Sequence, residues 1–143
     1  MWAQTYEERL RLWASLRQSV ADDPLDQQLE KINKWWSHAP RVNNVVHWND
    51  KDNWLSPWEL LAENGYCELA SALGLAYTII LVNKEADVKI AQAKDESSSD
   101  VTILVVDDKY ILNWDINSVI SKEQYKFKIK ETFDCSKLNE TIG

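Results

Sequence analysis

The stretch that decides the fold is residues 64–80, NGYCELASALGLAYTII, near the middle of the 143-residue chain. If the segment from Cys67 onward is drawn as a helix, apolar residues lie on almost every side of it. Four of its residues are small: Ala70, Ser71, Ala72 and Gly74. A surface helix would show a polar stripe, which this segment lacks. The pattern therefore predicts a helix in the middle of a domain, where close packing needs small side chains.

The sequence after this helix has the character of β-strands. Residues 101–106 are a strong β run, 107–108 a turn, 110–112 the returning strand, and 88–91 a shorter strand. Between 125 and 130, Tyr, Phe and Ile alternate with three Lys, which predicts an edge strand whose wet lysine face discourages edge-to-edge pairing.

The sequence before it favours helices. Apolar residues recur at spacings of four and three between 6 and 20, and again between 25 and 36. Ser56-Pro57-Trp58-Glu59 has the spacing of a capping box, and the short helix it opens should end with a left-handed stop at Asn64-Gly65. The predicted fold class is α+β, with N-terminal helices and the buried Cys-bearing helix packed against a C-terminal antiparallel sheet.

Length and charge narrow the classes of function. We expect one domain over 1–143, with N-terminal helices at 1–40, a core at 41–134 and a tail at 135–143. The net charge of −7 argues against nucleic acid as a partner. We expect no membrane partner and a cytoplasmic location, because no apolar run reaches about 20 residues and the start is acidic.

Residues 42–115 carry a resemblance to a known family. Asp52-Asn53-Trp54-Leu55-Ser56-Pro57-Trp58-Glu59 is followed at short distance by Gly65-Tyr66-Cys67-Glu68, and later by Leu112-Asn113-Trp114-Asp115. This order resembles the bacterial transglutaminase-like cysteine peptidases, whose relatives include adhesin-cleaving proteases and bacteriophage proteins. The resemblance covers about half of the chain and implies a papain/transglutaminase-like fold.

The resemblance also implies a catalytic set. Cys67 would be the nucleophile, at a helix start where the macrodipole favours thiolate. The family has a His on the next strand to take the proton and an Asp or Asn on the following strand to orient that His. Asn113 aligns best with the orienting position, and Asp115 is the next candidate.

The catalytic His is missing from this sequence. Val101 or Thr102 stands in its place, and neither side chain accepts a proton at neutral pH. His38 is interpreted as a surface loop residue. His47 is interpreted as a structural residue packed beside Trp48, with a role as substitute base for Cys67 kept as the alternative.

We predict no cofactor and no metal site. Some relatives hold calcium with acids beside the nucleophile, but Tyr66 and Leu69 stand at two of those positions and only Glu68 remains. The acidic residues at 50, 52, 107 and 108 are interpreted as solvated turns, because their spacing matches no EF-hand loop. Cys135 is interpreted as incidental.

Eight tryptophans are unusual for one small core. We assign four of them to the core: Trp13, Trp36, Trp54 and Trp58. The other four could form an exposed patch of the kind found at interface hot spots or in sugar-binding grooves: Trp2, Trp35, Trp48 and Trp114.

The favoured function is therefore non-catalytic. We expect a catalytically degenerate scaffold that serves as a structural or protein-binding module, in a bacteriophage setting such as a virion neck or tail, or bound to a host protein. Its partners would be proteins, and its location the host cytoplasm or the virion. The alternative is an active cysteine peptidase or amide hydrolase that uses Cys67, with His47 or a partner-supplied His as base.

Overall fold

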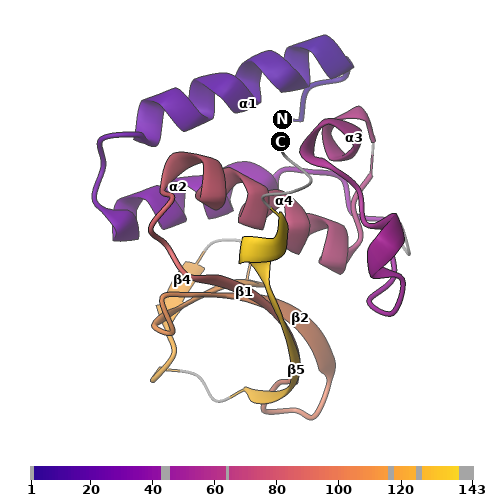
Figure 1. The fold of residues 1–143 in the computed structure, drawn as a ribbon, viewed down its shortest axis with the longest axis vertical. Helices are drawn as coiled ribbons and strands as arrows, with labels where there is room; N and C mark the ends of the chain where they lie inside the picture. Colours follow the sequence, from indigo (N-terminus) through magenta and orange to yellow (C-terminus); the bar gives the residue numbers. More distant parts are fainter. Residues whose placement is uncertain (1, 43–45, 64, 116–117, 125–126, 139–143) are drawn as a thin grey trace.

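The computed structural model describes residues 2–42, 46–63, 65–115, 118–124 and 127–138. A layer of helices lies over one curved sheet (Figure 1). The helical layer consists of α1 (Tyr6–Val20), α2 (Leu25–Ser37), the short helix η1 (Lys51–Asn53), α3 (Pro57–Ala62) and α4 (Glu68–Val82). Helix α4 packs against β1 and β2, as the apolar pattern predicts, while α2 beside it packs against β3 and β4 (Figure 1).

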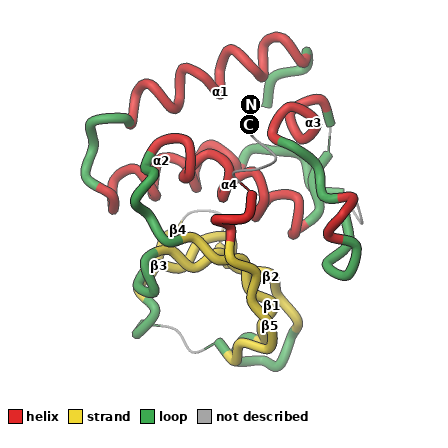
Figure 2. Tube along the Cα trace, viewed as in Figure 1, coloured by secondary structure: helices red, strands yellow, loops and turns green. Residues whose placement is uncertain are grey.

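The sheet has five strands, and every paired strand runs antiparallel to its neighbour. Its order is β4-β3-β2-β1-β5, and the sheet curves strongly (Figure 2). The strands are β1 (Val88–Lys94), β2 (Asp100–Val106), β3 (Tyr110–Asp115), β4 (Ser118–Ser121) and β5 (Lys128–Asp134), followed by the short helix η2 (Cys135–Leu138). The α+β class is confirmed.

Strand β2 shows how the two faces of the sheet are used. Leu104 and Val106 belong to the main core under the helices, whereas Ile103 and Val105 belong to a smaller cluster on the opposite face. Because side chains alternate along a strand, Thr102 lies on the helix face and Val101 on the other. This alternation decides which of the two residues faces α4.

Helix α4 is joined to the first two helices by one buried hydroxyl. Thr78 Oγ1 accepts from Trp13 Nε1 at 2.8 Å and from Trp36 Nε1 at 3.0 Å, and it donates to Gly74 O at 2.7 Å. A Cβ on Gly74 would lie 2.6 Å from the Trp36 ring. The small residue predicted in this helix is thus what lets α2 approach it.

The end of α3 differs from the prediction. The capping box of Ser56 and Glu59 is confirmed, but the helix ends at Ala62 and Gly65 does not have a positive φ. Asn64 lies outside the described residues. Gly65 is required for close approach instead, because a Cβ there would lie 2.6 Å from Val42.

Several boundaries in the last third of the chain also differ. Strand β4 was not predicted, and β5 spans 128–134 rather than 125–130, of which 125–126 lie outside the described residues. In the described part of the tail, 135–138, Cys135 and Leu138 are buried, whereas Ser136 and Lys137 are exposed. Burial raises the pKa of the Cys135 thiol to about 12, consistent with an inert side chain.

The tryptophans are distributed differently from the expectation. Trp13, Trp36 and Trp54 are buried as predicted, but so are Trp2 and Trp48 from the expected patch; Trp35 is half-buried. Trp58, assigned to the core, is 45% exposed. The side chain of Trp114 lies outside the described residues. Trp2 and Trp48 therefore do not belong to an exposed patch, which the sequence analysis had left open.

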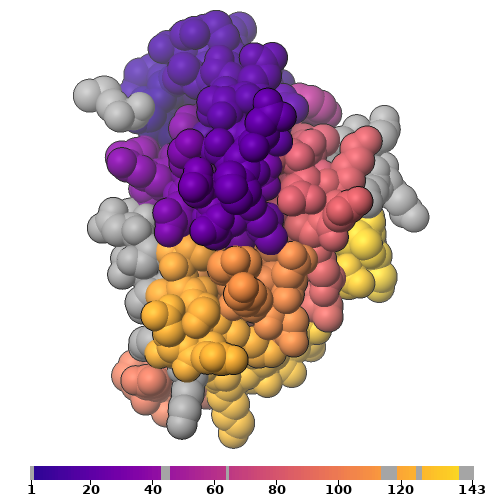
Figure 3. Space-filling view, turned by 90° about the vertical axis from the view of Figure 1, so that its left-hand side faces the viewer, coloured from indigo at the N-terminus to yellow at the C-terminus, as the bar shows by residue number. Residues whose placement is uncertain are grey.

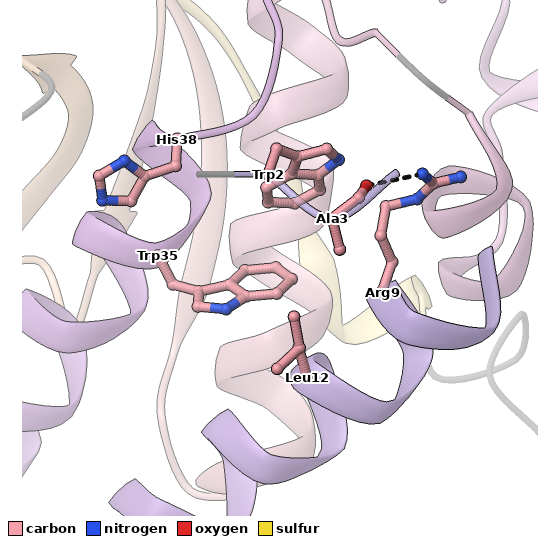
Figure 4. Close-up of a pocket in the computed structure, with 6 residues that line it drawn as sticks. All are labelled: Trp2, Ala3, Arg9, Leu12, Trp35 and His38. Atoms are coloured by element: carbon pink, nitrogen blue, oxygen red, sulfur yellow. Dashed lines mark hydrogen bonds between the residues drawn. The ribbon is translucent and has the colours of Figure 1, made fainter. Parts of the chain in front are cut away.

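The N-terminal segment explains why Trp2 is buried. In Figure 4 its ring lies over Trp35, and the two ring centroids are 4.7 Å apart. Arg9 Nη1 donates to Ala3 O at 2.9 Å and to Gln4 O at 3.0 Å, which holds this segment against α1.

On the face shown in Figure 3, the N-terminal helices lie directly above β3 and β4. No helix among the described residues is long and apolar enough to cross a membrane.

Candidate functional site

Cys67 lies at the N-cap of α4, on the wall of a cavity of about 400 Å³. Its residue is 8% exposed, and its Sγ accepts from the Ala70 N–H at 3.4 Å. The carbonyl oxygen of Val46 lies 3.8 Å from Sγ, in position to accept from the thiol. The sulfur atom thus has both a donor partner and an acceptor partner within the fold.

Thr102 occupies the position where the resemblance places the catalytic base. It lines the same cavity as Cys67, while Val101 packs against the cluster on the far face of the sheet. Of the two residues considered for that position, Thr102 is therefore the one that shares a cavity with Cys67. A threonine hydroxyl cannot take the proton of a thiol at neutral pH.

Asn113 lies beside Thr102, as its predicted place on the next strand requires. Its Nδ2 donates to Thr102 O at 2.8 Å and to Glu68 O at 3.1 Å. Its backbone has a φ of 67°, a left-handed conformation that Asn tolerates better than most residues. In this structure the amide joins β3 to β2 and to the start of α4.

Asp115, the second candidate for the orienting role, is the last residue of β3. Its side chain lies outside the described part of the chain. Its role therefore stays a prediction.

His47 is not packed in the structure. It is exposed and lines the cavity that also borders Cys67, so its interpretation as a residue packed beside Trp48 is wrong. The loop that carries it is held to the sheet edge, because Trp48 Nε1 donates to the Glu131 carboxylate of β5. Its possible role as a substitute base stays a prediction. His38 is exposed at the end of α2, consistent with a surface residue.

Glu68 is a residue of this site that the sequence analysis treated only as a remnant. It is half-buried, and its Oε1 accepts from the Thr102 N–H at 2.7 Å. Burial raises the pKa of this carboxyl, while the Thr102 N–H and the charge of Arg41 act in the opposite direction. The signal that could have found it is its position directly after Cys67, facing the strand that lacks the base.

A second cavity of about 360 Å³ adjoins the first. Both are lined by Glu68, Gln92 and Thr102, and the second extends to Asp100 and Lys130. Gln92 was also missed by the sequence analysis, although it is a polar residue in an otherwise largely apolar stretch of β1. The two cavities together make a polar groove along the start of α4 and the strands β1 and β2, which we call the Cys67 groove.

The acidic residues interpreted as turns are exposed at all four positions. Asp107 and Asp108 have φ values of 53° and 51°, which suit the tight turn between β2 and β3. Over the part of the chain that the structure describes, no group of three or more His, Cys, Asp or Glu residues is placed to hold a metal ion.

Comparison with known proteins shows the fold. No family profile and no curated protein matches the sequence. Two similar solved structures are Legionella pneumophila LapG in calcium-bound form and the same protein after EGTA treatment. The first has a TM-score of 0.75 and 17% identity and covers 93% of this chain and 78% of that one. The second has a TM-score of 0.74 and 18% identity, with 93% and 76% covered.

LapG is a bacterial transglutaminase-like cysteine peptidase. At this level of identity the likeness shows the fold alone. The papain/transglutaminase-like architecture expected from the sequence is thereby confirmed.

Proposed function

We propose that this chain is a catalytically degenerate protein of the transglutaminase-like cysteine peptidase fold, which binds a protein segment in the Cys67 groove without cleaving it. The observation that carries the proposal is that Thr102, at the strand position where the resemblance places the base, lines the same cavity as Cys67. A cysteine peptidase relies on a His within reach, which takes the thiol proton and later protonates the leaving amine.

The use of Asn113 supports the same proposal. Both donor contacts of its side-chain amide go to backbone carbonyls, those of Thr102 and Glu68. An orienting Asn would accept an imidazole N–H through its Oδ1, and among the described residues neither His38 nor His47 donates to Asn113. The groove provides space for part of another chain in two adjoining cavities of about 400 and 360 Å³.

The biological setting belongs to the proposal as well. We place the protein in a bacteriophage, as a neck or tail component of the virion or as a binder of a host protein, in the host cytoplasm or the particle. This step rests on the resemblance to phage-encoded relatives and is an analogy. Purified phage particles should contain the protein, detected by mass spectrometry, if it is a virion component; capture of a host protein from infected cells supports the other setting. The absence of both contradicts the proposed setting.

The non-catalytic assignment is tested by restoring the base. Cys67 should react slowly with iodoacetamide at neutral pH, and Thr102→His should accelerate the reaction by about tenfold or more, because the new imidazole can accept the proton. Thr102→Gln, which adds size without a base, is the matched control, and Cys67→Ala gives the background. Fast alkylation and peptidase activity in the unmodified protein would contradict the assignment.

An active thiol hydrolase is the second candidate, and one observation favours it: His47 lines the same cavity as Cys67. In that case His47→Ala should abolish hydrolysis and slow alkylation of Cys67. We carry no calcium over from the similar LapG structure, because Tyr66 and Leu69 flank Cys67 and Glu68 where the family has acids.

A further inference from the structure

We infer that Glu68 is the specificity-determining residue of the Cys67 groove, and that it receives a Lys or Arg side chain of the bound protein segment. This inference rests on the proposed function and names the chemistry of its partner. It comes from the hydrogen bonds of the Glu68 carboxylate and the charges around it.

Only one oxygen of this carboxylate is occupied. Oε1 accepts from the Thr102 N–H, whereas no hydrogen bond or ion pair from the described residues reaches Oε2. Glu68 is half-buried and lines both cavities of the groove. A half-buried carboxylate without a cation is costly, and a cationic group that enters the groove recovers part of that cost.

The cationic side chains that line the groove form no ion pair with Glu68 in the described structure. Lys130 Nζ lies 3.2 Å from Asp100 Oδ1, which also takes Lys94 Nζ at 3.1 Å. Arg41 lines the groove and lowers the pKa of Glu68 by its charge, yet within the described residues it forms no ion pair with it. Arg41 is exposed and is therefore a competitor that a bound cation displaces.

The other residues that line the Cys67 groove favour a cationic protein side chain over a divalent metal ion. Gln92 and Thr102 line both cavities together with Glu68, and their amide and hydroxyl groups can pair with a guanidinium, an ammonium or a peptide backbone. A divalent cation prefers several oxygen ligands, and the described residues bring no three such acidic or His groups together. A Lys or Arg side chain of a protein segment can pair with Glu68 and with these neutral polar groups, whereas the second carboxylate of the groove, Asp100, is already paired with Lys94 and Lys130.

Cys67 serves as the reporter in a direct test. It is modified with three methanethiosulfonates that carry a trimethylammonium, a neutral methyl or a sulfonate group; each loses methanesulfinate as the mixed disulfide forms. The cationic reagent should react about tenfold faster than the anionic one, after correction for their rates with free cysteine. The neutral reagent reports access to the thiol.

Variants assign this preference to Glu68. Glu68→Gln should reduce the corrected ratio to near one, while the Gln carbonyl still accepts from the Thr102 N–H. Glu30→Gln, at an exposed site on α2, removes the same net charge and should leave the ratio unchanged. Arg41→Gln should raise it, because a competing cation is removed.

A second measurement needs no variant. N-acetyl-argininamide should protect Cys67 from iodoacetamide at lower concentration than its neutral isostere N-acetyl-citrullinamide. Equal protection by the two compounds, or a reagent ratio that survives Glu68→Gln, would overturn the inference. Because the ratio of rates does not depend on the absolute reactivity of the thiol, these outcomes remain distinct from failure of the non-catalytic assignment.

Discussion

The polar side chains at the two ends of α4 differ in how many of their hydrogen-bonding positions have a partner. Near its C-terminal end, Thr78 is fully buried and its hydroxyl takes two indole donors and gives its own proton to Gly74 O. At its N-terminal end, Glu68 is half-buried and only one carboxylate oxygen has a partner in the described chain. One helix thus carries a completed polar network and an incomplete one.

This difference in hydrogen bonding distinguishes polar groups that stabilise the fold from polar groups that are available to bind a ligand. A buried polar group that is fully paired fixes how helices pack, and removing a partner is expensive. A polar group left open to a cavity stabilises the fold little and can pair with a ligand. We therefore expect substitutions at the Thr78 end to lower stability, and substitutions at the Glu68 end to alter recognition.

The largest effect should come from Thr78→Val. This change leaves the indole N–H groups of Trp13 and Trp36 without an acceptor and should lower the free energy of unfolding by about 3 kcal/mol. Urea denaturation measures it, with Thr132→Val on the exposed face of β5 as the control. A loss as small as that of the control would remove the contrast between the two ends.

Gly74→Ala should cost about 2 kcal/mol, because the new Cβ would lie 2.6 Å from the Trp36 ring. The same denaturation experiment on Trp36→Leu and on the double variant completes a mutant cycle. The cost of the added methyl should shrink when the ring is absent. An unchanged cost would show that the ring does not set this close approach.

Glu68→Gln should change the free energy of unfolding by no more than about 0.5 kcal/mol at neutral pH, since the Thr102 N–H keeps an acceptor. This small change would accompany the loss of cation preference described above. A loss comparable to that of Thr78→Val would instead make Glu68 a structural residue like its counterpart.

The smallest effect concerns pH. The pKa of Glu68 is raised by burial, so the folded state binds its proton more tightly than the unfolded state. Relative to Glu68→Gln, the unmodified protein should therefore lose stability as pH rises from about 4.3, the ordinary Glu value, through the raised folded pKa. Paired urea titrations across this range measure the difference, and a difference that grows in the opposite direction would contradict the raised pKa.

The sequence predicted the parts of the fold that depend on local pattern. The all-apolar segment from Leu69 gave the buried helix, and the capping spacing at Ser56 gave the start of α3. Strand β4 was missed because its four residues are defined by pairing with β3. The start of β5 was misplaced because its limits depend on pairing with β1, which is interrupted by a bulge at Gln92/Ala93.

The order of the site residues along the chain could be predicted from the sequence. Which residues of β2 point toward α4 could not. The order of Cys67 and Asn113 followed from the resemblance, but the choice between Val101 and Thr102 required knowing which face of β2 lies under α4. The exposure of His47 and the burial of Trp2 depend on long-range contacts, such as Trp48 with Glu131 and Trp2 with Tyr66, which local sequence does not encode.

The central claim, that the Cys67 groove has no working base, is tested most directly by one rate. The second-order rate constant for iodoacetamide at Cys67 should agree within about twofold between the unmodified protein and His47→Ala at pH 7. A fall of about tenfold or more in the variant, with loss of a measurable hydrolytic activity, would show that His47 is the base and would contradict the account.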